Sequence, residues 1–147
     1  FTVIDTCDWG IVIPVIETPK GRSLLMVHQW RHGSNCESLE FPGGVIERGE
    51  SAENGVRREL LEETGYRCSS LELLASLSPN PAIMSNRVHI FAAQGLEASG
   101  IQSLDENEYL NIVLVKEEEV LAQIGKPPYI HALMTAALGL YIGKIKK

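Results

Sequence analysis

The chain has 147 residues, 44% hydrophobic and 22% charged, a balance typical of one soluble globular domain with a sizeable core. Its net charge is −6 and no basic cluster precedes the C-terminal lysines, so binding to nucleic acid through the phosphates is not expected. No apolar stretch is long enough to span a bilayer, and three scattered cysteines without a CxxC pair are typical of free thiols in a reducing cytoplasm. We therefore expect a cytoplasmic protein that is not in a membrane.

The first part of the chain is predicted to form two strands and a short third run. Residues 10–16 and 23–28 are apolar and β-branched, and a Pro/Gly-containing turn at 18–21 separates them. Pro14 falls inside the first run, which indicates an edge position or a bulge in that strand. A short apolar run at 39–41 then leads into two glycines.

Residues 51–64 are predicted to form a helix that begins at the N-cap Ser51 and stops at a left-handed Gly65. Gly55 weakens this helix by about 1 kcal/mol relative to Ala, so it indicates a tight packing contact. Later strands are expected at 71–77, 87–93 and 109–115, and helices at 116–124 and 129–142. Strands interleaved with helices predict an α/β fold, with a mixed sheet between helices in a single domain of residues 1–147.

The segment that carries most chemical information lies on the helix predicted at 51–64. Glu59, Glu62 and Glu63 fall at i, i+3 and i+4, so their carboxylates share one helix face. Like charges at this spacing repel one another, and a hard cation such as Mg²⁺ or Mn²⁺ would relieve the repulsion by binding to the oxygens. The simpler interpretation of three clustered glutamates is a solvated acidic face.

The wider spacing favours the metal site over the solvated face. Gly44 is followed after five residues by Glu50, and after seven more by the run Arg-Glu-apolar-x-Glu-Glu-x-Gly-apolar that begins at Arg58. The probability that this spacing arises by chance over such a length is very small. In a metal site, Arg58 and Glu50 would act as braces that orient the metal-binding carboxylates.

Residues 44–66 resemble the box of the Nudix hydrolases at every defined position. The resemblance implies an α/β/α sandwich with a mixed central sheet, and an enzyme that cleaves a nucleoside diphosphate linked to another group with the help of a metal. It also implies that Glu59 and Glu63 bind the metal, that Glu62 joins them and takes part in catalysis, and that the carbonyl group of Gly43 contributes.

The approach to this box resembles that of the ADP-ribose and nucleoside-diphosphate-sugar pyrophosphatases, although Gly43 stands where that subgroup more often has alanine. Three residues of this approach, Arg31, Glu40 and Trp30, are candidates for substrate contact. Arg31 would bind a phosphate bidentately, with an ordinary surface arginine as the alternative. Trp30 would stack on a base, with a buried core residue as the alternative.

A second acidic group at 105–109 comes just before a predicted strand. In the resembling pyrophosphatases a loop at this place supplies the general base, which implies Glu106 as the first candidate and Glu108 as the second. An exposed acidic turn is the alternative. Three histidines, at 28, 32 and 131, show no ligand spacing and receive no role.

The leading hypothesis is a Mg²⁺- or Mn²⁺-dependent pyrophosphatase that converts ADP-ribose or a related nucleoside-diphosphate sugar to a nucleoside monophosphate and a sugar phosphate. The alternatives are a Nudix hydrolase for a dinucleotide, a dinucleoside polyphosphate or a damaged nucleotide, and a Nudix-like domain that binds ADP-ribose without cleaving it. The resembling subgroup carries additional N-terminal strands that help to form a homodimer and the nucleoside pocket. Only nine residues precede Gly10, so either such strands lie upstream of Phe1 or the substrate belongs to another subgroup.

Overall fold

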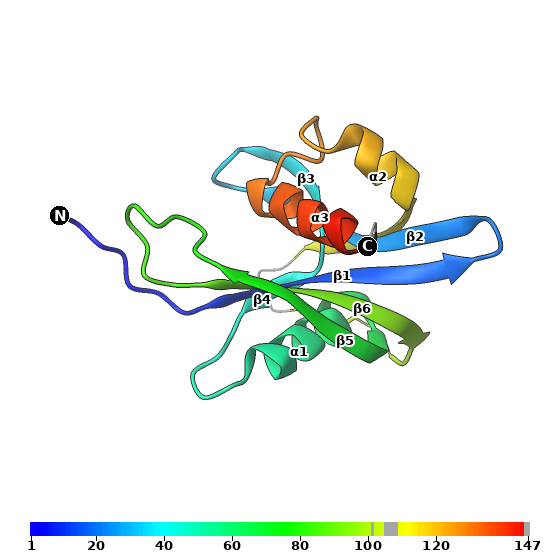
Figure 1. Cartoon of the computed structure of the whole chain (residues 1–147), viewed down its shortest axis with the longest axis horizontal. Coiled ribbons are helices and arrows are strands. Elements are labelled where there is room, and N and C mark those ends of the chain that lie inside the picture. Colours follow the sequence, from blue (N-terminus) through cyan, green and yellow to red (C-terminus); the bar gives the residue numbers. More distant parts are fainter. Residues whose placement is uncertain (101, 105–108, 146–147) are drawn as a thin grey trace.

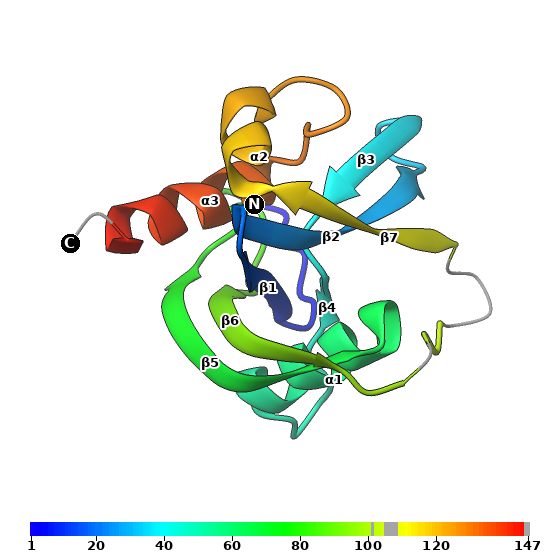
Figure 2. The ribbon, with the colours of Figure 1, turned by 90° about the vertical axis from the view of Figure 1, so that its right-hand side faces the viewer.

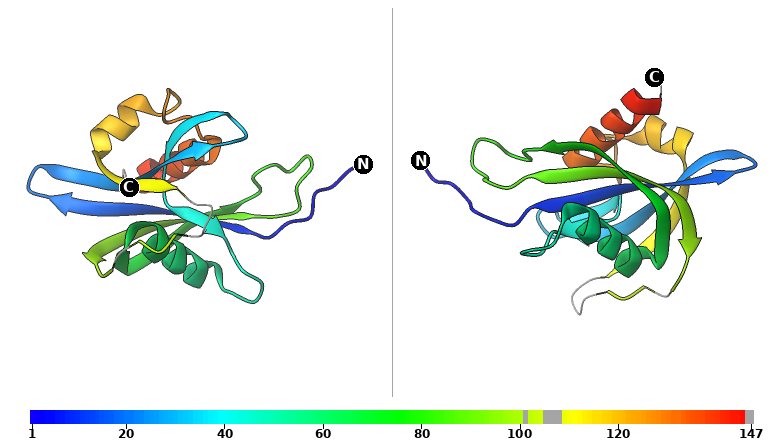
Figure 3. Two further views of the ribbon diagram at one scale, coloured as in Figure 1. Left: turned by 180° about the vertical axis from the view of Figure 1, so that it is seen from behind. Right: turned by 60° about the horizontal axis from the view of Figure 1, so that its bottom comes forward.

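The computed structural model describes residues 1–100, 102–104 and 109–145. A curled sheet separates one helix on one face from two helices on the other (Figure 1), and the views in Figure 3 show the same separation. The strands are β1 (Trp9–Thr18), β2 (Gly21–Arg31), β3 (Cys36–Glu40), β4 (Gly43–Val45), β5 (Tyr66–Leu77), β6 (Val88–Ala98) and β7 (Leu110–Lys116). The helices are α1 (Ala52–Thr64), α2 (Glu117–Gln123) and α3 (Ala132–Ile145). The expected α/β/α sandwich is confirmed.

The sheet is mixed, as predicted. Its main path runs β3-β2-β1-β6-β5, while β4 pairs with β1 and β7 pairs with β2. The pair β1–β6 is parallel and the other pairs are antiparallel. Figure 2 shows how strongly the strands curl around α1.

Two apolar clusters fill the layers on either side of the sheet. In β1 the buried Val12 belongs to the cluster under α1, whereas its neighbour Ile13 belongs to the cluster under α2 and α3. This alternation follows from the two-residue period of a strand. Val56 and Leu60 supply the helix side of the first cluster.

The edge position predicted from Pro14 is wrong, because β1 lies in the middle of the sheet. The bulge predicted as the alternative is not found either, because the pairings of β1 with β2 and β6 contain no register shift. Pro14 is the last residue of β1 that pairs with β6, and the pairing with β2 begins at Val15. The missing N–H therefore falls where the strand changes partners. None of the helices in the described parts of the chain is long and apolar enough to cross a membrane.

Candidate active site

Helix α1 is positioned by local signals at both ends. The Ser51 side chain accepts a hydrogen bond from the N–H of Asn54 at 3.2 Å, and Gly65 closes the helix in the left-handed region with φ 73°. A Cβ atom on Gly55 would lie 2.6 Å from the Ile46 side chain, so the predicted tight contact is confirmed. These features fix the direction in which the helix glutamates point.

Two of the three glutamates lie against strand β4. The carboxylate of Glu63 accepts a hydrogen bond from the Gly43 N–H at 2.8 Å, and Glu63 is only 4% exposed. A Cβ on Gly44 would lie 2.5 Å from the Oε1 atom of Glu59, so the missing side chain leaves the space that Glu59 occupies. The paired glycines therefore allow two carboxylates to approach the backbone of β4.

Arg58 connects the glutamates. Its Nη1 group donates to Glu59 at 2.8 Å and to Glu62 at 3.0 Å, and its Nε and Nη2 groups each donate to Glu50 at 3.2 Å. The same guanidinium also donates to the Val45 carbonyl at 3.0 Å. The hydrogen bond from Arg58 lowers the pKa of Glu50, and these carboxylates together raise the pKa of Arg58. This is the geometry of the brace that the spacing predicts.

The donor set has the right chemistry for a hard cation, since every side-chain ligand expected from the box is a carboxylate. Within the described parts of the chain, however, no three Asp, Glu, His or Cys side chains converge into a ready-made metal site. Glu59 and Glu62 both turn toward Arg58, and Glu62 is 42% exposed. The grouping of Glu59, Glu62, Glu63 and the Gly43 carbonyl around a metal therefore stays a prediction.

Beside the box lies an ion pair between a buried carboxylate and a partly exposed arginine. Arg31 Nε donates to Glu40 Oε1 at 2.9 Å and Arg31 Nη2 to Glu40 Oε2 at 2.6 Å, a bidentate arrangement, and Glu40 is 3% exposed. Burial opposes the charge on Glu40, but the two bonds from Arg31 outweigh it and lower the pKa of this carboxyl group. A charged acceptor is thus held beside the box.

Two cavities extend from this pair. The larger has a volume of about 430 Å³ and the smaller about 90 Å³. Both are lined by Trp9, Arg31, Glu40, His131 and Leu133, and the smaller one also reaches Gly43 and Gly44 of the box. The two cavities therefore adjoin, with the smaller one against the glycines of the box.

The three residues predicted to contact the substrate do not lie together in the structure. Arg31 and Glu40 line both cavities, whereas Trp30 is 49% exposed and lines neither. The alternative of a buried Trp30 is therefore wrong. Glu106 and Glu108 lie outside the described residues. His131, to which the sequence assigns no role, lines the cavities, because the fold brings the start of α3 next to β3; no local spacing could have indicated this.

Three glutamates of one helix lie beside a strand that contains two glycines, and one arginine holds the glutamates in place. This arrangement is typical of proteins with a Nudix box. The family model for the NUDIX domain matches residues 9–135, so the chain belongs to the Nudix family. The chain is 32% identical over 113 residues to the methanol dehydrogenase activator of Bacillus methanolicus, and 33% identical over 113 residues to the ADP-ribose pyrophosphatase of Bacillus subtilis. Each alignment covers 76% of the chain and spans only 61% and 60% of the respective relative.

A third relative is the ADP compounds hydrolase NudE of Escherichia coli, 28% identical over 130 residues that cover 88% of the chain and 67% of that protein. Among solved structures, the crystal structure of an ADP compounds hydrolase matches with a TM-score of 0.83 and 27% identity. That alignment covers 95% of the chain and 72% of the matched chain. The likeness therefore extends well beyond the box.

Proposed function

We propose that the chain is a metal-dependent pyrophosphatase that hydrolyses the diphosphate linkage of ADP-ribose or a related nucleoside-diphosphate sugar. The observation that carries the proposal is the pair of adjoining cavities beside the Arg31–Glu40 pair, the smaller of which reaches the glycines of the box. The cavities have room for a group attached to a diphosphate whose phosphates lie at the box. The names of the Bacillus subtilis and Escherichia coli relatives support the same substrate class.

Mg²⁺ or Mn²⁺ is the proposed cofactor, held by Glu59, Glu62, Glu63 and the Gly43 carbonyl. When bound, such an ion would neutralise charge on the phosphate oxygens and lower the pKa of a water molecule. In this proposal Arg58 keeps the carboxylates in place through its three carboxylate contacts.

The general base is proposed to be Glu106 first and Glu108 second, with Glu62 as the next candidate. Glu62 is supported by its position on the box helix and its partial exposure, which leaves its carboxylate accessible to water. Arg31, in turn, is proposed to contact the substrate at the rim of the cavity, where it is held in place by Glu40.

A substrate panel tests the reaction. The purified chain with Mg²⁺ should release AMP from ADP-ribose or an ADP-sugar, or GMP from a GDP-sugar, and EDTA should abolish the release. Product analysis of dinucleotides, dinucleoside polyphosphates and damaged nucleotides in the same assay tests the other Nudix substrates. Binding of ADP-ribose without any product would favour the non-catalytic domain.

We propose a cytoplasmic homodimer that does not bind nucleic acid. The homodimer is supported by β7, which pairs only with β2 in the described part of the sheet and exposes Ile112, Val113 and Leu114 at that edge. The mass in solution, measured by light scattering for the chain and for Val113→Glu, tests this arrangement. A dimer that the substitution leaves intact would place the interface elsewhere.

A further inference from the structure

The imidazole of His131 has a fixed orientation at the start of α3. Its Nδ1 atom accepts a hydrogen bond from the N–H of Leu133 at 3.1 Å, in the manner of an N-cap. A neutral imidazole that accepts at Nδ1 carries its proton at Nε2. The Nε2 atom lies 4.0 Å from Glu40 Oε2, too far for a direct hydrogen bond. His131 therefore presents an N–H donor to the cavity beside a carboxylate acceptor.

Ser38 adds a second polar group to the same cavity. It is 1% exposed, and its hydroxyl group meets no hydrogen-bond partner within the described structure. The hydroxyl lies beside the Glu40 carboxylate and, after Arg31, helps to lower the pKa of that carboxyl group against its burial. A buried hydroxyl without a partner costs free energy, so a ligand that completes its bonding would gain affinity.

These groups are matched to a neutral ligand with hydroxyl groups. Arg31 neutralises Glu40, so the pair carries no net charge that would attract either a phosphate or a cation. A hydroxyl is both a donor and an acceptor, so one hydroxyl can accept from His131 Nε2 and donate to Glu40 Oε2. A second hydroxyl on the same ring would meet Ser38.

We propose that the 430 Å³ cavity is a subsite for the sugar attached to the distal phosphate of the substrate, and that Ser38 and His131 select it by hydrogen bonds to its hydroxyl groups. This proposal rests on the proposed pyrophosphatase function and adds a recognition role for two residues. Ser38 and Glu40 lie on strand β3, whereas His131 comes just before α3. Polar groups from two separate elements suit hydroxyls that project from several sides of a ring rather than the flat edge of a base.

Two substitutions test the subsite. Ser38→Ala removes the hydroxyl alone, and His131→Asn keeps an oxygen that can cap α3 but withdraws the Nε2 donor from Glu40. Each should raise KM for ADP-ribose about 5-fold, as expected for the loss of one hydrogen bond. The KM for the methyl ester of ADP, which has no distal sugar, should stay unchanged. Ser70→Ala is the matched control, because this exposed serine on β5 lines neither cavity and its replacement should leave both KM values unchanged.

Stability separates recognition from a structural role. Ser38→Ala should leave the unfolding temperature unchanged or raise it, because the variant buries one polar group fewer. Equal increases in KM for ADP-ribose and for the methyl ester would overturn the proposal and assign the cavity to the nucleoside. Unchanged KM values in both variants would overturn it as well.

A binding measurement is independent of hydrolysis. Ribose 5-phosphate, added to the intact chain with Mg²⁺, should shift the imidazole NMR signal of His131 in a saturable way, and Ser38→Ala should weaken that binding. The signal is assigned by its loss in His131→Asn. The absence of any shift overturns the sugar subsite. A saturable shift in a chain that does not cleave ADP-ribose would retain the subsite and reject the pyrophosphatase function.

Discussion

Glu63 accepts a hydrogen bond from the backbone N–H of Gly43 at 2.8 Å. This bond joins the box helix α1 to strand β4, so the carboxylate expected to bind the metal also fixes the strand beside it. Because Glu63 is almost fully buried, its charge is costly unless other groups bind it. The two functions of the side chain can be separated by a substitution that preserves the hydrogen bond.

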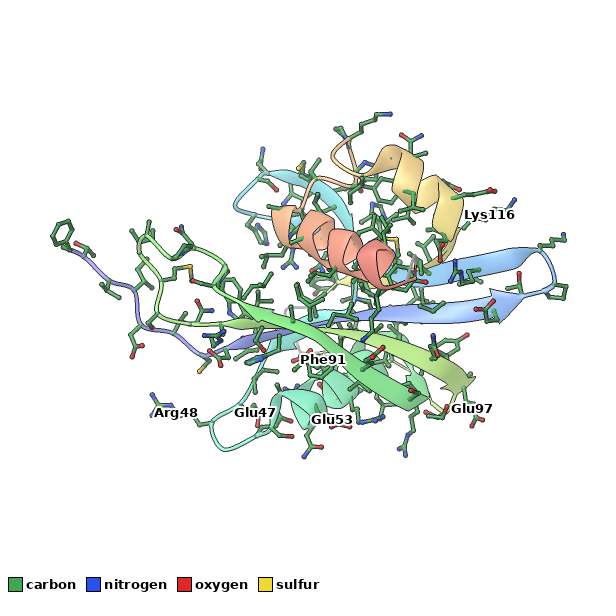
Figure 4. The ribbon with its side chains drawn as sticks, viewed as in Figure 1. Glu47, Arg48, Glu53, Phe91, Glu97 and Lys116 are labelled. Carbon is green, nitrogen blue, oxygen red and sulfur yellow. The ribbon has the colours of Figure 1, made fainter. Side chains whose placement is uncertain are left out.

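Glu63→Gln keeps an oxygen acceptor for Gly43 but removes the negative charge. We expect turnover to fall by roughly two orders of magnitude or more, since a bound metal contributes several kcal/mol to catalysis, while the fold persists. Steady-state kinetics and circular dichroism measure the two effects. Glu53→Gln is the control, because Glu53 lies on the outer side of α1, away from the sheet (Figure 4). Unchanged turnover in Glu63→Gln would falsify the metal-site assignment.

Arg58→Lys should weaken metal binding more than it weakens folding. Lysine keeps the positive charge but cannot reach Glu50, Glu59 and Glu62 together, as the guanidinium does. We expect the Mg²⁺ concentration for half-maximal activity to rise by about 10- to 100-fold, the usual effect of losing a residue that orients metal ligands.

Arg57→Lys is the matched control for that measurement. The neighbouring Arg57 bonds Glu53 and the Cys68 carbonyl rather than the box carboxylates. Its replacement should leave the Mg²⁺ requirement unchanged. If Arg58→Lys showed the same Mg²⁺ requirement as the unmodified chain, Arg58 would only stabilise α1 and would not orient the metal ligands.

The sequence predicted helix α1 to within one residue because its signals are local. Ser51 and Gly65 act on the backbone next to them, and the glutamate spacing acts within one turn. Strand β4 and the central position of β1 were not predicted. Both depend on pairing between distant segments, and a three-residue strand through Gly43 and Gly44 carries no periodicity of its own.

The residues of the site differ in the same way, since some could be predicted from local spacing and others depend on contacts between distant segments. The box residues could be identified from spacing alone, whereas the cavity combines Trp9, Ser38 and His131, which are far apart in the sequence. Their meeting depends on the packing of α3 against the sheet. Only Arg31 and Glu40 were predicted in the larger cavity. Arg31 was predicted because it follows a strand and can bind a phosphate bidentately, and Glu40 because of the resemblance.

The two glycines of β4 should respond differently to alanine. A Cβ on Gly43 would lie 2.1 Å from the Gly10 carbonyl oxygen, a backbone atom that cannot move aside easily. Gly43→Ala should therefore lower the free energy of unfolding by about 1–3 kcal/mol. This crowding also gives a physical reason why the chain has glycine where the resembling subgroup more often has alanine.

A Cβ on Gly44 would meet only the end of the Glu59 side chain, at 2.5 Å, and that side chain can rotate. Gly44→Ala should therefore keep the fold but displace a carboxylate that is proposed to bind the metal, and raise the Mg²⁺ requirement. Chemical denaturation and Mg²⁺ titration of both variants check the contrast. Equal loss of stability in the two variants would show that Glu59 is held as rigidly as the backbone.

The Arg31–Glu40 pair should contribute to acid sensitivity. The pKa of Glu40 is lowered in the fold, against burial, by its bonds to Arg31, so the fold favours the charged form. The contribution to stability is complete above about pH 4.5, the usual range for a glutamate, and is lost as the pH falls through the lowered pKa. Urea denaturation at pH 7, 5, 4 and 3 should show a smaller loss of stability in Glu40→Gln than in the unmodified chain.

The control for this measurement is Glu37→Gln. Glu37 lies on the same strand but is exposed, so this variant should lose as much stability with falling pH as the unmodified chain does. Equal losses in all three proteins would mean that other carboxylates determine the acid limit.

The assignment of the general base can be decided by pH–rate profiles. If Glu106 removes the proton from water, Glu106→Gln should lower kcat by about 10²- to 10⁴-fold and abolish the acidic limb of the profile. The Mg²⁺ requirement should stay the same, because a base need not bind the metal. Glu108→Gln should have the smaller effect, as the second candidate. If neither substitution slows turnover, Glu62 becomes the better candidate, since it is the most exposed of Glu59, Glu62 and Glu63 and its carboxylate is accessible to water.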